Sequence, residues 1–315
     1  MNEGAHSKPV VLIAGPTASG KSAVAMELAR AGGGVIINAD ALQVYRELRI
    51  LTARPTVEEE REIPHRLYGT VPASEPYSVA LWLDAAREAI EESWSRNQIP
   101  IVTGGTGLYF KALEEGIASL PAIPPPVRQR WRDKLSHEGA AVLHAELARL
   151  EQSEAERLKP SDGQRIVRAL EVIEATGKPL SAWQTEAGSE GALARSPVLR
   201  LYLSPPREEL YARINQRFEH MIEAGGLREA EALLALQLSP SLPALKATGI
   251  PQLHRFLAGE IGFEESCRIA KRDTRHYAKR QLTWARRNMI AWKWLCEKLT
   301  KSSLRHFVNF IRLND

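Results

Sequence analysis

The sequence has very few cysteines and no long apolar run. Only Cys267 and Cys296 are present among 315 residues, and they form no Cys-x-x-Cys pair. This excludes a disulfide framework and a cysteine-based zinc site, and it favours reduced thiols in a cytosolic protein. No apolar stretch approaches the ~20 residues that span a bilayer, and residues 1–9 lack the apolar region of a secretory signal. A cytoplasmic protein that does not enter the membrane is therefore expected.

Charge of one sign is not in large excess either. The net charge is +4, which does not by itself indicate a nucleic-acid partner. The distribution is more informative, because residues 268–287 contain eight Lys or Arg side chains and a single acid, Asp273. With 44% apolar and 25% charged residues, the chain has the composition of a packed globular protein.

Short β-rich runs alternate with helical patterns in the N-terminal part of the chain. The patterns over 23–31 and 79–94 are those of amphipathic helices. Such alternation is typical of an α/β fold, in which a parallel sheet has helices on both faces. The β-rich runs are Val10–Ala14, Val35–Asn38, Ile99–Thr103 and Val198–Leu203.

The alternation stops between Pro121 and Pro197, where helical patterns follow one another without a convincing strand. We therefore predict an all-α insertion domain over 121–196 inside an α/β core made of 1–120 and 197–315. The helices expected in the insertion cover 127–137, 140–150 and 162–176.

Only helices are expected after Pro206, which gives the core a helical C-terminal part. The longest runs from Phe263 to about Trp294, and residues 299–315 either form a last helix or are partly disordered.

A phosphate-binding loop follows the first β-rich run. The stretch GPTASGKS has the Gly-x-x-x-x-Gly-Lys-Ser pattern between a strand and a helix, the context that this motif requires. Its backbone N–H groups form an anion cradle, Lys21 adds a positive charge, and the Ser22 hydroxyl can ligate Mg²⁺. The motif indicates two or more linked phosphates without identifying the molecule that carries them. The predicted cradle residues are Gly15, Pro16, Thr17, Ala18, Ser19, Gly20, Lys21 and Ser22.

Two further segments follow predicted strands. Asp40 closes VIINAD, and ligands of open parallel sheets bind at the carboxyl ends of the strands. Asp40 is predicted to face a second substrate as a base or binding group; a helix cap or an outer magnesium ligand is the alternative. In VTGGTGLY, glycines stand where a P-loop ATPase usually has an acidic residue, which argues against ordinary ATP hydrolysis. These glycines permit either a close approach of the backbone to a ligand or a tight turn.

Clusters of basic residues are candidate anion contacts. Arg213 and Arg217 lie four positions apart on one predicted helix face, where they either close over a diphosphate or are surface charges. Gln164, Arg165 and Arg168 gather within about one turn of another helix, and solvated charge is the alternative explanation there.

The segment RHYAKRQLTWARR, residues 275–287, interleaves basic side chains with Tyr277 and Trp284. Basic and aromatic residues together suit a nucleic-acid backbone and its exposed bases. An amphipathic helix with both rings in the core is the alternative.

Taken in order, these segments resemble the tRNA dimethylallyltransferase (tRNA isopentenyltransferase) family through nearly the whole chain. Ala41 and Leu42 depart from that pattern, in which Ser and Met are usual, and residues 247–252 lack an aromatic and a charged residue of the family. The matching segments are the phosphate loop, Asp40–Tyr45, Leu51–Pro55, Gly104–Tyr109, Gln164–Glu171 and Arg280–Trp284.

The resemblance implies a P-loop NTPase-like fold adapted to alkyl transfer by a monomer. It implies that the cradle and Arg217 bind the diphosphate of dimethylallyl diphosphate. The acceptor would be N6 of the adenosine 3′ of the anticodon in tRNAs that read codons beginning with U. Asp40 would act as general base beside Thr106, while Lys21 and Mg²⁺ on Ser22 stabilise the departing diphosphate.

The partner implied by the resemblance is a tRNA anticodon stem-loop. Gln43 is implied to help recognise the flipped base, and Arg128 and Arg168 to contact the RNA. The predicted tRNA-binding residues are Asp40, Ala41, Leu42, Gln43, Thr106, Arg128, Gln164, Arg165, Ile166, Val167, Arg168, Lys279, Arg280 and Gln281.

Three other functions remain open at this point. A small-molecule kinase would use the same loop for ATP, but the glycines after the third strand argue against it. An adenylate isopentenyltransferase would alkylate free AMP, but such enzymes lack a large RNA-binding insertion. A non-catalytic RNA-binding module would not need Lys21, Ser22 and Asp40.

Overall fold

The computed structural model describes residues 8–118, 120–186 and 191–296, so the expectation for residues 299–315 lies outside the described residues. The chain divides into two compact units. The first contains Met1–Glu114 and Ala192–Asp315, and the second contains Glu115–Gly191. The first unit contains the β-sheet, and the second is helical.

The first unit is built on a parallel β-sheet. Within the described residues it has six strands in the order β3-β2-β4-β1-β5-β6, and each neighbouring pair is parallel. The four predicted β-rich runs are confirmed as strands. The strands are β1 (Val10–Ala14), β2 (Gly34–Asn38), β3 (His65–Arg66), β4 (Ile99–Gly104), β5 (Val198–Leu203) and β6 (Lys293–Leu295).

The expectation of helices alone after Pro206 is wrong at one place. The long helix α13 (Phe263–Asn288) ends earlier than predicted, and β6 then pairs with the edge of β5. Strands of two or three residues carry too little alternation to be recognised in a sequence, which is why β3 and β6 were not predicted.

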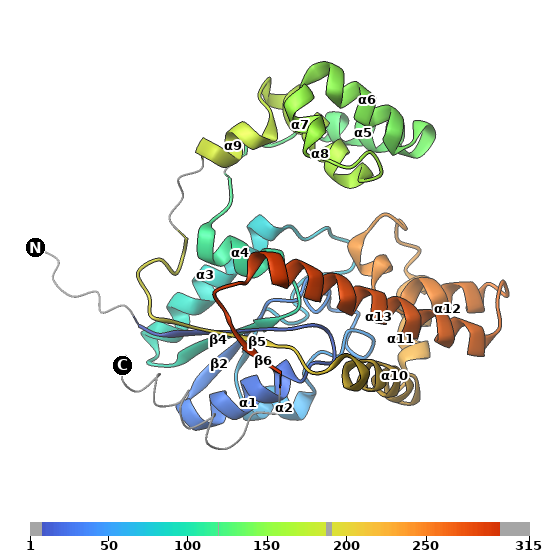
Figure 1. Cartoon of the computed structure of the whole chain (residues 1–315). Helices are drawn as coiled ribbons and strands as arrows, with labels where there is room; N and C mark the ends of the chain where they lie inside the picture. Colours follow the sequence, from blue (N-terminus) through green and yellow to red (C-terminus); the bar gives the residue numbers. More distant parts are fainter. Residues whose placement is uncertain (1–7, 119, 187–190, 297–315) are drawn as a thin grey trace, which may run out of the picture. The chain divides into compact units, whose positions relative to one another are not determined.

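Helices α1 (Lys21–Gly32) and α3 (Val79–Ser95) cover opposite faces of the sheet (Figure 1). The chain moves from β1 past β4 to reach β2, continues outward to β3, and then returns through α3 to β4. Because crossovers between parallel strands are right-handed, a reversal of direction places the two helices on opposite faces. Both faces of the central strands are therefore buried, which explains their continuous apolar sequences.

The carboxyl ends of three strands lie at one level. Ala14 of β1 pairs with Gly104 of β4, and Asn38 of β2 pairs with Thr103. The phosphate loop, the Asp40 segment and the glycine turn, which follow these three strands, are thus brought together at one edge of the sheet.

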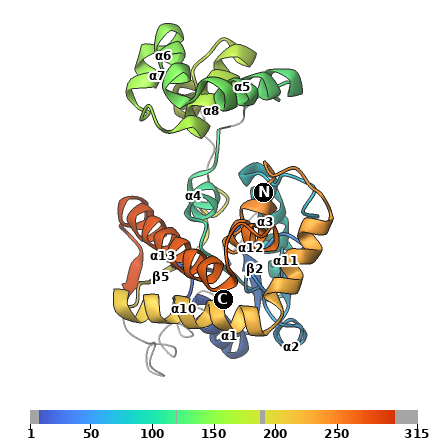
Figure 2. The same ribbon diagram turned by 90° about the vertical axis from the view of Figure 1, so that its right-hand side faces the viewer.

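Helices complete the first unit around this edge. The long α13 contacts both α10 (Arg207–Glu223) and α12 (Ile250–Leu257) (Figure 2). Its Ala278 and Ala285 are fully buried, and these small side chains permit a close approach. The remaining helices of this unit are α2 (Val57–Glu62), α4 (Gly107–Glu115), α11 (Gly226–Ala235) and the 3₁₀ helix η1 (Pro243–Lys246).

The second unit has its own apolar core. Trp131, Leu143, Leu147, Ile166 and Leu170 pack together in it. Asp162 caps the N-terminus of α8 by accepting a bond from the Arg165 amide. The helices are α5 (Pro125–Glu138), α6 (Ala140–Leu150), α7 (Gln152–Glu156), α8 (Gly163–Thr176) and α9 (Leu180–Glu186).

Candidate active site

The phosphate loop has the backbone of an anion cradle. Ala18 and Gly20 have positive φ angles of 62° and 93°, and N–H groups in such turns form anion-binding concavities. Gly15 is required because a Cβ there would come within 2.8 Å of the Leu203 carbonyl oxygen. The N-terminus of α1 directly follows the loop and adds its unpaired amides and dipole.

Two cations from distant parts of the chain meet at this loop. Burial lowers the pKa of Lys21 to about 8, while the nearby Asp40 carboxylate acts in the opposite direction. Burial also lowers the pKa of the Arg217 guanidinium, whose Nε is buried without a hydrogen-bond partner. Two partly desolvated cations beside an anion cradle favour a ligand that carries more than one negative charge.

The two arginines of α10 differ in their surroundings. Arg217 donates from Nη1 to the Thr17 hydroxyl at 3.4 Å and lines the main cavity. Arg213 donates to the Ser19 carbonyl oxygen at 3.4 Å and forms an ion pair with Glu209. Of the two, Arg217 lines the main cavity, whereas Arg213 lines a separate hollow on the outer side of the loop.

Asp40 is fixed by hydrogen bonds to residues two positions before and after it in the chain. Its Oδ1 accepts a bond of 3.0 Å from the Leu42 amide, and its amide donates to Asn38 Oδ1 at 2.8 Å. The Thr106 hydroxyl accepts a bond of 2.9 Å from the Ala41 amide, which joins the glycine turn to this segment. The second carboxylate oxygen of Asp40 remains available for a ligand.

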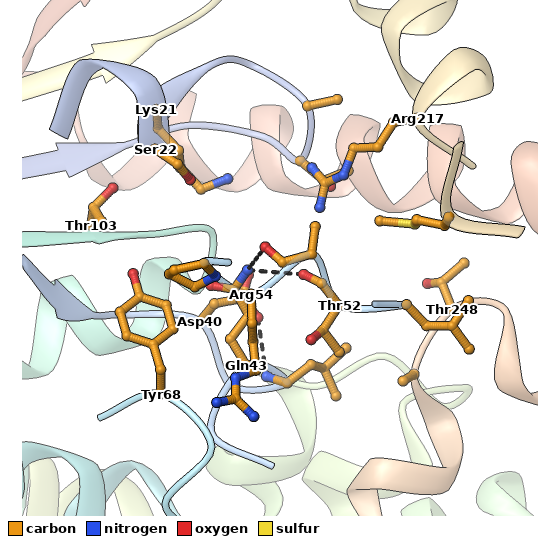
Figure 3. Close-up of a pocket in the computed structure, with 18 of the residues that line it drawn as sticks. Lys21, Ser22, Asp40, Gln43, Thr52, Arg54, Tyr68, Thr103, Arg217 and Thr248 are labelled. Atoms are coloured by element: carbon orange, nitrogen blue, oxygen red, sulfur yellow. Dashed lines mark hydrogen bonds between the residues drawn. The ribbon is translucent and has the colours of Figure 1, made fainter. Parts of the chain in front are cut away.

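These groups surround a cavity of about 410 Å³ (Figure 3). Lys21 and Arg217 extend into it from one side, and Asp40 faces it from another. Its remaining wall is partly apolar, so that the cavity suits a ligand with an anionic head and a small apolar part. The apolar wall includes Met26, Ile36, Leu51, Ile214, Phe218 and Met221.

The three glycines at the end of β4 and just after it serve contacts within the protein. A Cβ at Gly104 would overlap the Ala39 backbone, one at Gly105 would overlap the Gln281 amide, and one at Gly107 would overlap the Trp284 ring. The sequence left open whether these glycines approach a ligand or form a tight turn. They allow the close approach of the Ala39 backbone, just after β2, and of α13 to the turn.

Gln43 uses its amide to hold a neighbouring loop. Its Nε2 donates at 2.9 Å to the carbonyl oxygens of both Thr52 and Ala53. Its Oε1 is the group that remains for a ligand in the cavity that Gln43 lines.

Two cavity residues were not recognised as site residues from the sequence. Burial raises the pKa of Tyr68, which keeps its hydroxyl protonated as a hydrogen-bond donor. The Arg54 side chain is 7% exposed, lies 3.8 Å from Glu60 and packs against Gly69, where a Cβ would overlap its guanidinium. Tyr68 follows the two-residue strand β3, which is too short to show a sequence pattern. Arg54 lies in the segment Leu51–Pro55 that resembles the family, but no local pattern indicates what its side chain does.

A second, smaller cavity of about 250 Å³ adjoins the glycine turn and α13. Tyr277 lines both cavities, and the Arg280 guanidinium lies 5.7 Å from its ring centroid. Trp284 lies in this cavity against Gly107, so its ring packs on the turn. Lys279 and Arg280 are exposed on the same helix.

In the second unit, the predicted RNA contacts on α8 differ in exposure. Gln164 and Arg165 are exposed, and Arg168 pairs at 3.3 Å with the buried Glu171. Ile166 and Val167 are buried in the core of the unit, so a tRNA contact predicted for them would have to involve their backbone. On α5, Arg128 is exposed.

The described side chains by themselves provide few ligands for a metal ion. No three His, Cys, Asp or Glu side chains gather to form a metal site in the described part of the chain. A cation on the Ser22 hydroxyl would therefore need further oxygen ligands from the phosphates of a bound molecule, which is how Mg²⁺ commonly binds. Across residues 8–118, 120–186 and 191–296, no helix has the length and apolar character to cross a membrane.

Comparison with protein families gives two matches. The family described as IPP transferase matches residues 43–288, and that described as isopentenyl transferase matches residues 8–70. Among curated proteins, a tRNA dimethylallyltransferase of Nitrobacter hamburgensis is 51% identical over 294 residues, covering 93% of this chain and 92% of the relative. One of Rhodopseudomonas palustris (strain BisA53) is 53% identical, covering 93% and 89%.

Solved structures are also similar over most of this chain. The full-length tRNA isopentenylpyrophosphate transferase of Bacillus halodurans is 32% identical with a TM-score of 0.69, covering 98% of this chain and 96% of that one. A eukaryotic dimethylallyltransferase acting on tRNA is 29% identical with a TM-score of 0.76, covering 89% and 70%. The predicted P-loop α/β fold is thereby confirmed.

Proposed function

This chain belongs to the tRNA dimethylallyltransferase family, and from that premise we propose that it transfers a dimethylallyl group from dimethylallyl diphosphate to tRNA. The acceptor is N6 of the adenosine 3′ of the anticodon in tRNAs that read codons beginning with U. The observation that supports this most directly is one cavity lined by Lys21, Arg217 and Asp40. It combines a place for a diphosphate with a carboxylate for a second substrate.

The reaction divides between the two sides of the cavity. The allylic C–O bond breaks, the electron pair leaves with the diphosphate, and a C–N bond forms to N6 of adenosine. Lys21 and Arg217 stabilise the negative charge that develops on the leaving group. Asp40 accepts the proton that N6 loses, with Thr106 fixing the segment that carries it.

We propose Mg²⁺ as the cation of this site. The Ser22 hydroxyl and the oxygens of the donor diphosphate would hold it, and it would add positive charge at the leaving group. We propose tRNA contacts on each unit separately: Arg128, Gln164, Arg165 and Arg168 on the second unit, and Lys279 and Arg280 on α13 of the first.

The decisive experiment is mass spectrometry of tRNA nucleosides after incubation of the protein with dimethylallyl diphosphate and Mg²⁺. We expect an added dimethylallyl group on the adenosine next to the anticodon. Unmodified tRNA, together with binding of ATP in place of dimethylallyl diphosphate in titration calorimetry, would favour a small-molecule kinase.

Affinity for the donor is expected to depend on pH through Lys21. Its pKa is lowered to about 8, so above that pH the free site loses the charge that attracts the diphosphate. Bound diphosphate raises the pKa of Lys21, and the dissociation constant of the donor should therefore increase by up to about tenfold per pH unit above that value.

Calorimetry in buffers of different ionisation enthalpy measures the proton uptake that accompanies donor binding. The Lys21→Arg variant should remove the pH dependence, because guanidinium stays charged. Constant wild-type affinity across this pH range would contradict the assignment.

Binding of an anticodon stem-loop is expected to weaken steeply with salt. Each phosphate contact to single-stranded nucleic acid contributes about −0.7 to the slope of log K against log salt. Loss of Arg165 and Arg280 together should flatten the slope by roughly 1.4. Arg168 is less suitable for this test, because its removal would leave the buried Glu171 unpaired. Arg30→Ala, in the last turn of α1, is the control and should leave the slope unchanged.

The same preparation separates tRNA from free AMP as acceptor. In one reaction containing both, the stem-loop should be prenylated preferentially, because AMP offers neither the stem nor the loop backbone. Preferential prenylation of AMP, or a salt slope near zero, would favour an adenylate isopentenyltransferase.

A further inference from the structure

The Gln281 side chain lies in the basic segment of α13 but is engaged inside the protein. Its Oε1 accepts a hydrogen bond of 2.9 Å from the Thr17 amide, and its Nε2 donates one of 2.9 Å to the Gly105 carbonyl oxygen. Both ends of the amide are thus bound to backbone groups, which makes Gln281 unsuited to reading RNA.

The two partners of Gln281 belong to two different segments of the site: Thr17 lines the main cavity, and Gly105 lines the second, smaller one. Thr17 is part of the phosphate loop, which we assign to the donor. Gly105 is part of the turn that contacts the Asp40 segment, which we assign to the acceptor. One amide group therefore connects the loop that binds the leaving group to the turn beside the proposed base.

The connection is built tightly. A Cβ at Gly105 would overlap Gln281 Nε2 and would lie 3.2 Å from Asp40 Oδ2, so only glycine leaves room for this amide. The helix that carries Gln281 is held by the buried Ala278, which packs with Leu210 and Ile214 of α10. Packing thus restricts the helix, so the side-chain amide of Gln281 has little freedom to move.

Glutamine is required chemically, because this position must both accept and donate. A glutamate would retain the bond from Thr17 but would face the Gly105 carbonyl oxygen with a second oxygen. A leucine of similar size would make neither bond.

We propose that Gln281 is a positioning residue for the transfer, which sets the separation between the phosphate loop and the glycine turn and hence between the donor carbon and N6. This inference rests on the proposed function. Misplacement of reacting groups by about 1 Å can cost on the order of 10²-fold in rate.

The first test compares Gln281→Leu with Arg280→Ala, its exposed neighbour. Gln281→Leu should lower kcat by about 10- to 100-fold, with KM for the stem-loop and the salt slope close to the wild-type values. Arg280→Ala should raise KM and reduce the salt slope by about 0.7 while kcat changes little. Gln281→Glu should also lose kcat, which shows that the bond to Gly105 matters. An increase in stem-loop KM with unchanged kcat in Gln281→Leu would make Gln281 an RNA contact and overturn the proposal.

A double-mutant cycle with Gly105 keeps the test informative if one variant folds poorly. Gly105→Ala should lower kcat strongly when Gln281 is present, because the methyl group displaces its amide. The same change in a Gln281→Ala background should cost much less, since the methyl group then has room. Additive losses would contradict the proposal. A wild-type protein that prenylates no tRNA would instead refute the proposed function itself.

Discussion

Replacement of Asp40 by asparagine should reduce dimethylallyl transfer by about 10²- to 10⁴-fold, the usual contribution of a positioned general base. An amide has the size of the carboxylate but cannot accept the proton that N6 loses. Asparagine can still accept the bond from the Leu42 amide through Oδ1, so the local turn should survive. The measurement is the single-turnover rate with both substrates saturating.

Stem-loop affinity provides the control for this variant, and it should stay within about twofold of the wild type because the RNA backbone contacts lie elsewhere. Asp40 also supports the charge of Lys21, so the comparison should be made near neutral pH, below the pKa of about 8. Turnover at the wild-type rate would show that Asp40 is structural and that another group accepts the proton.

Replacement of Lys21 by alanine should weaken donor binding and slow transfer by about 10²- to 10³-fold, the range for the loss of one preorganised charge at a developing anion. The Lys21 side chain is partly buried beside the cradle, where water screens its charge less than at the open surface. Donor affinity is measured by calorimetry and the transfer rate by single turnover.

Arg213→Ala is the matched control for this second variant. Its guanidinium forms an ion pair with Glu209 and contacts the Ser19 carbonyl oxygen, so its loss should cost less than about tenfold in rate. Stem-loop affinity should be unchanged in both variants. A loss of tRNA affinity in Lys21→Ala equal to its loss of donor affinity would mean that the phosphate loop faces the RNA backbone.

Local sequence patterns predicted the central sheet and the phosphate loop correctly. A strand, a glycine-containing loop and a helix form one continuous segment around Gly15–Ser22, and neighbouring residues determine its conformation. The apolar runs of β2, β4 and β5 were recognised for the same reason. The position of Asp40 beside the loop followed from the general rule that the carboxyl ends of parallel strands share one edge.

Burial separated residues that the sequence grouped together. Ile166 and Arg165 are adjacent in the segment resembling an RNA-binding helix, but one is in the apolar core and the other is exposed. The choice between Arg213 and Arg217 was likewise open, because four positions on a helix place two side chains on one face without showing what lies opposite.

The sequence by itself determined the α/β class, the anion cradle with Lys21 and Ser22, and the proximity of Asp40, since each depends on contacts between near neighbours or on strand order. Only the tertiary structure decided which residues face one another across the cavity. Thr17 and Gln281 are 264 positions apart, and Gly105 and Gln281 are 176 apart. A hydrogen bond over such a separation leaves no periodicity in the sequence, because it depends on how α13 packs on α10 and on the glycine turn, and that packing exists only once the whole unit has folded.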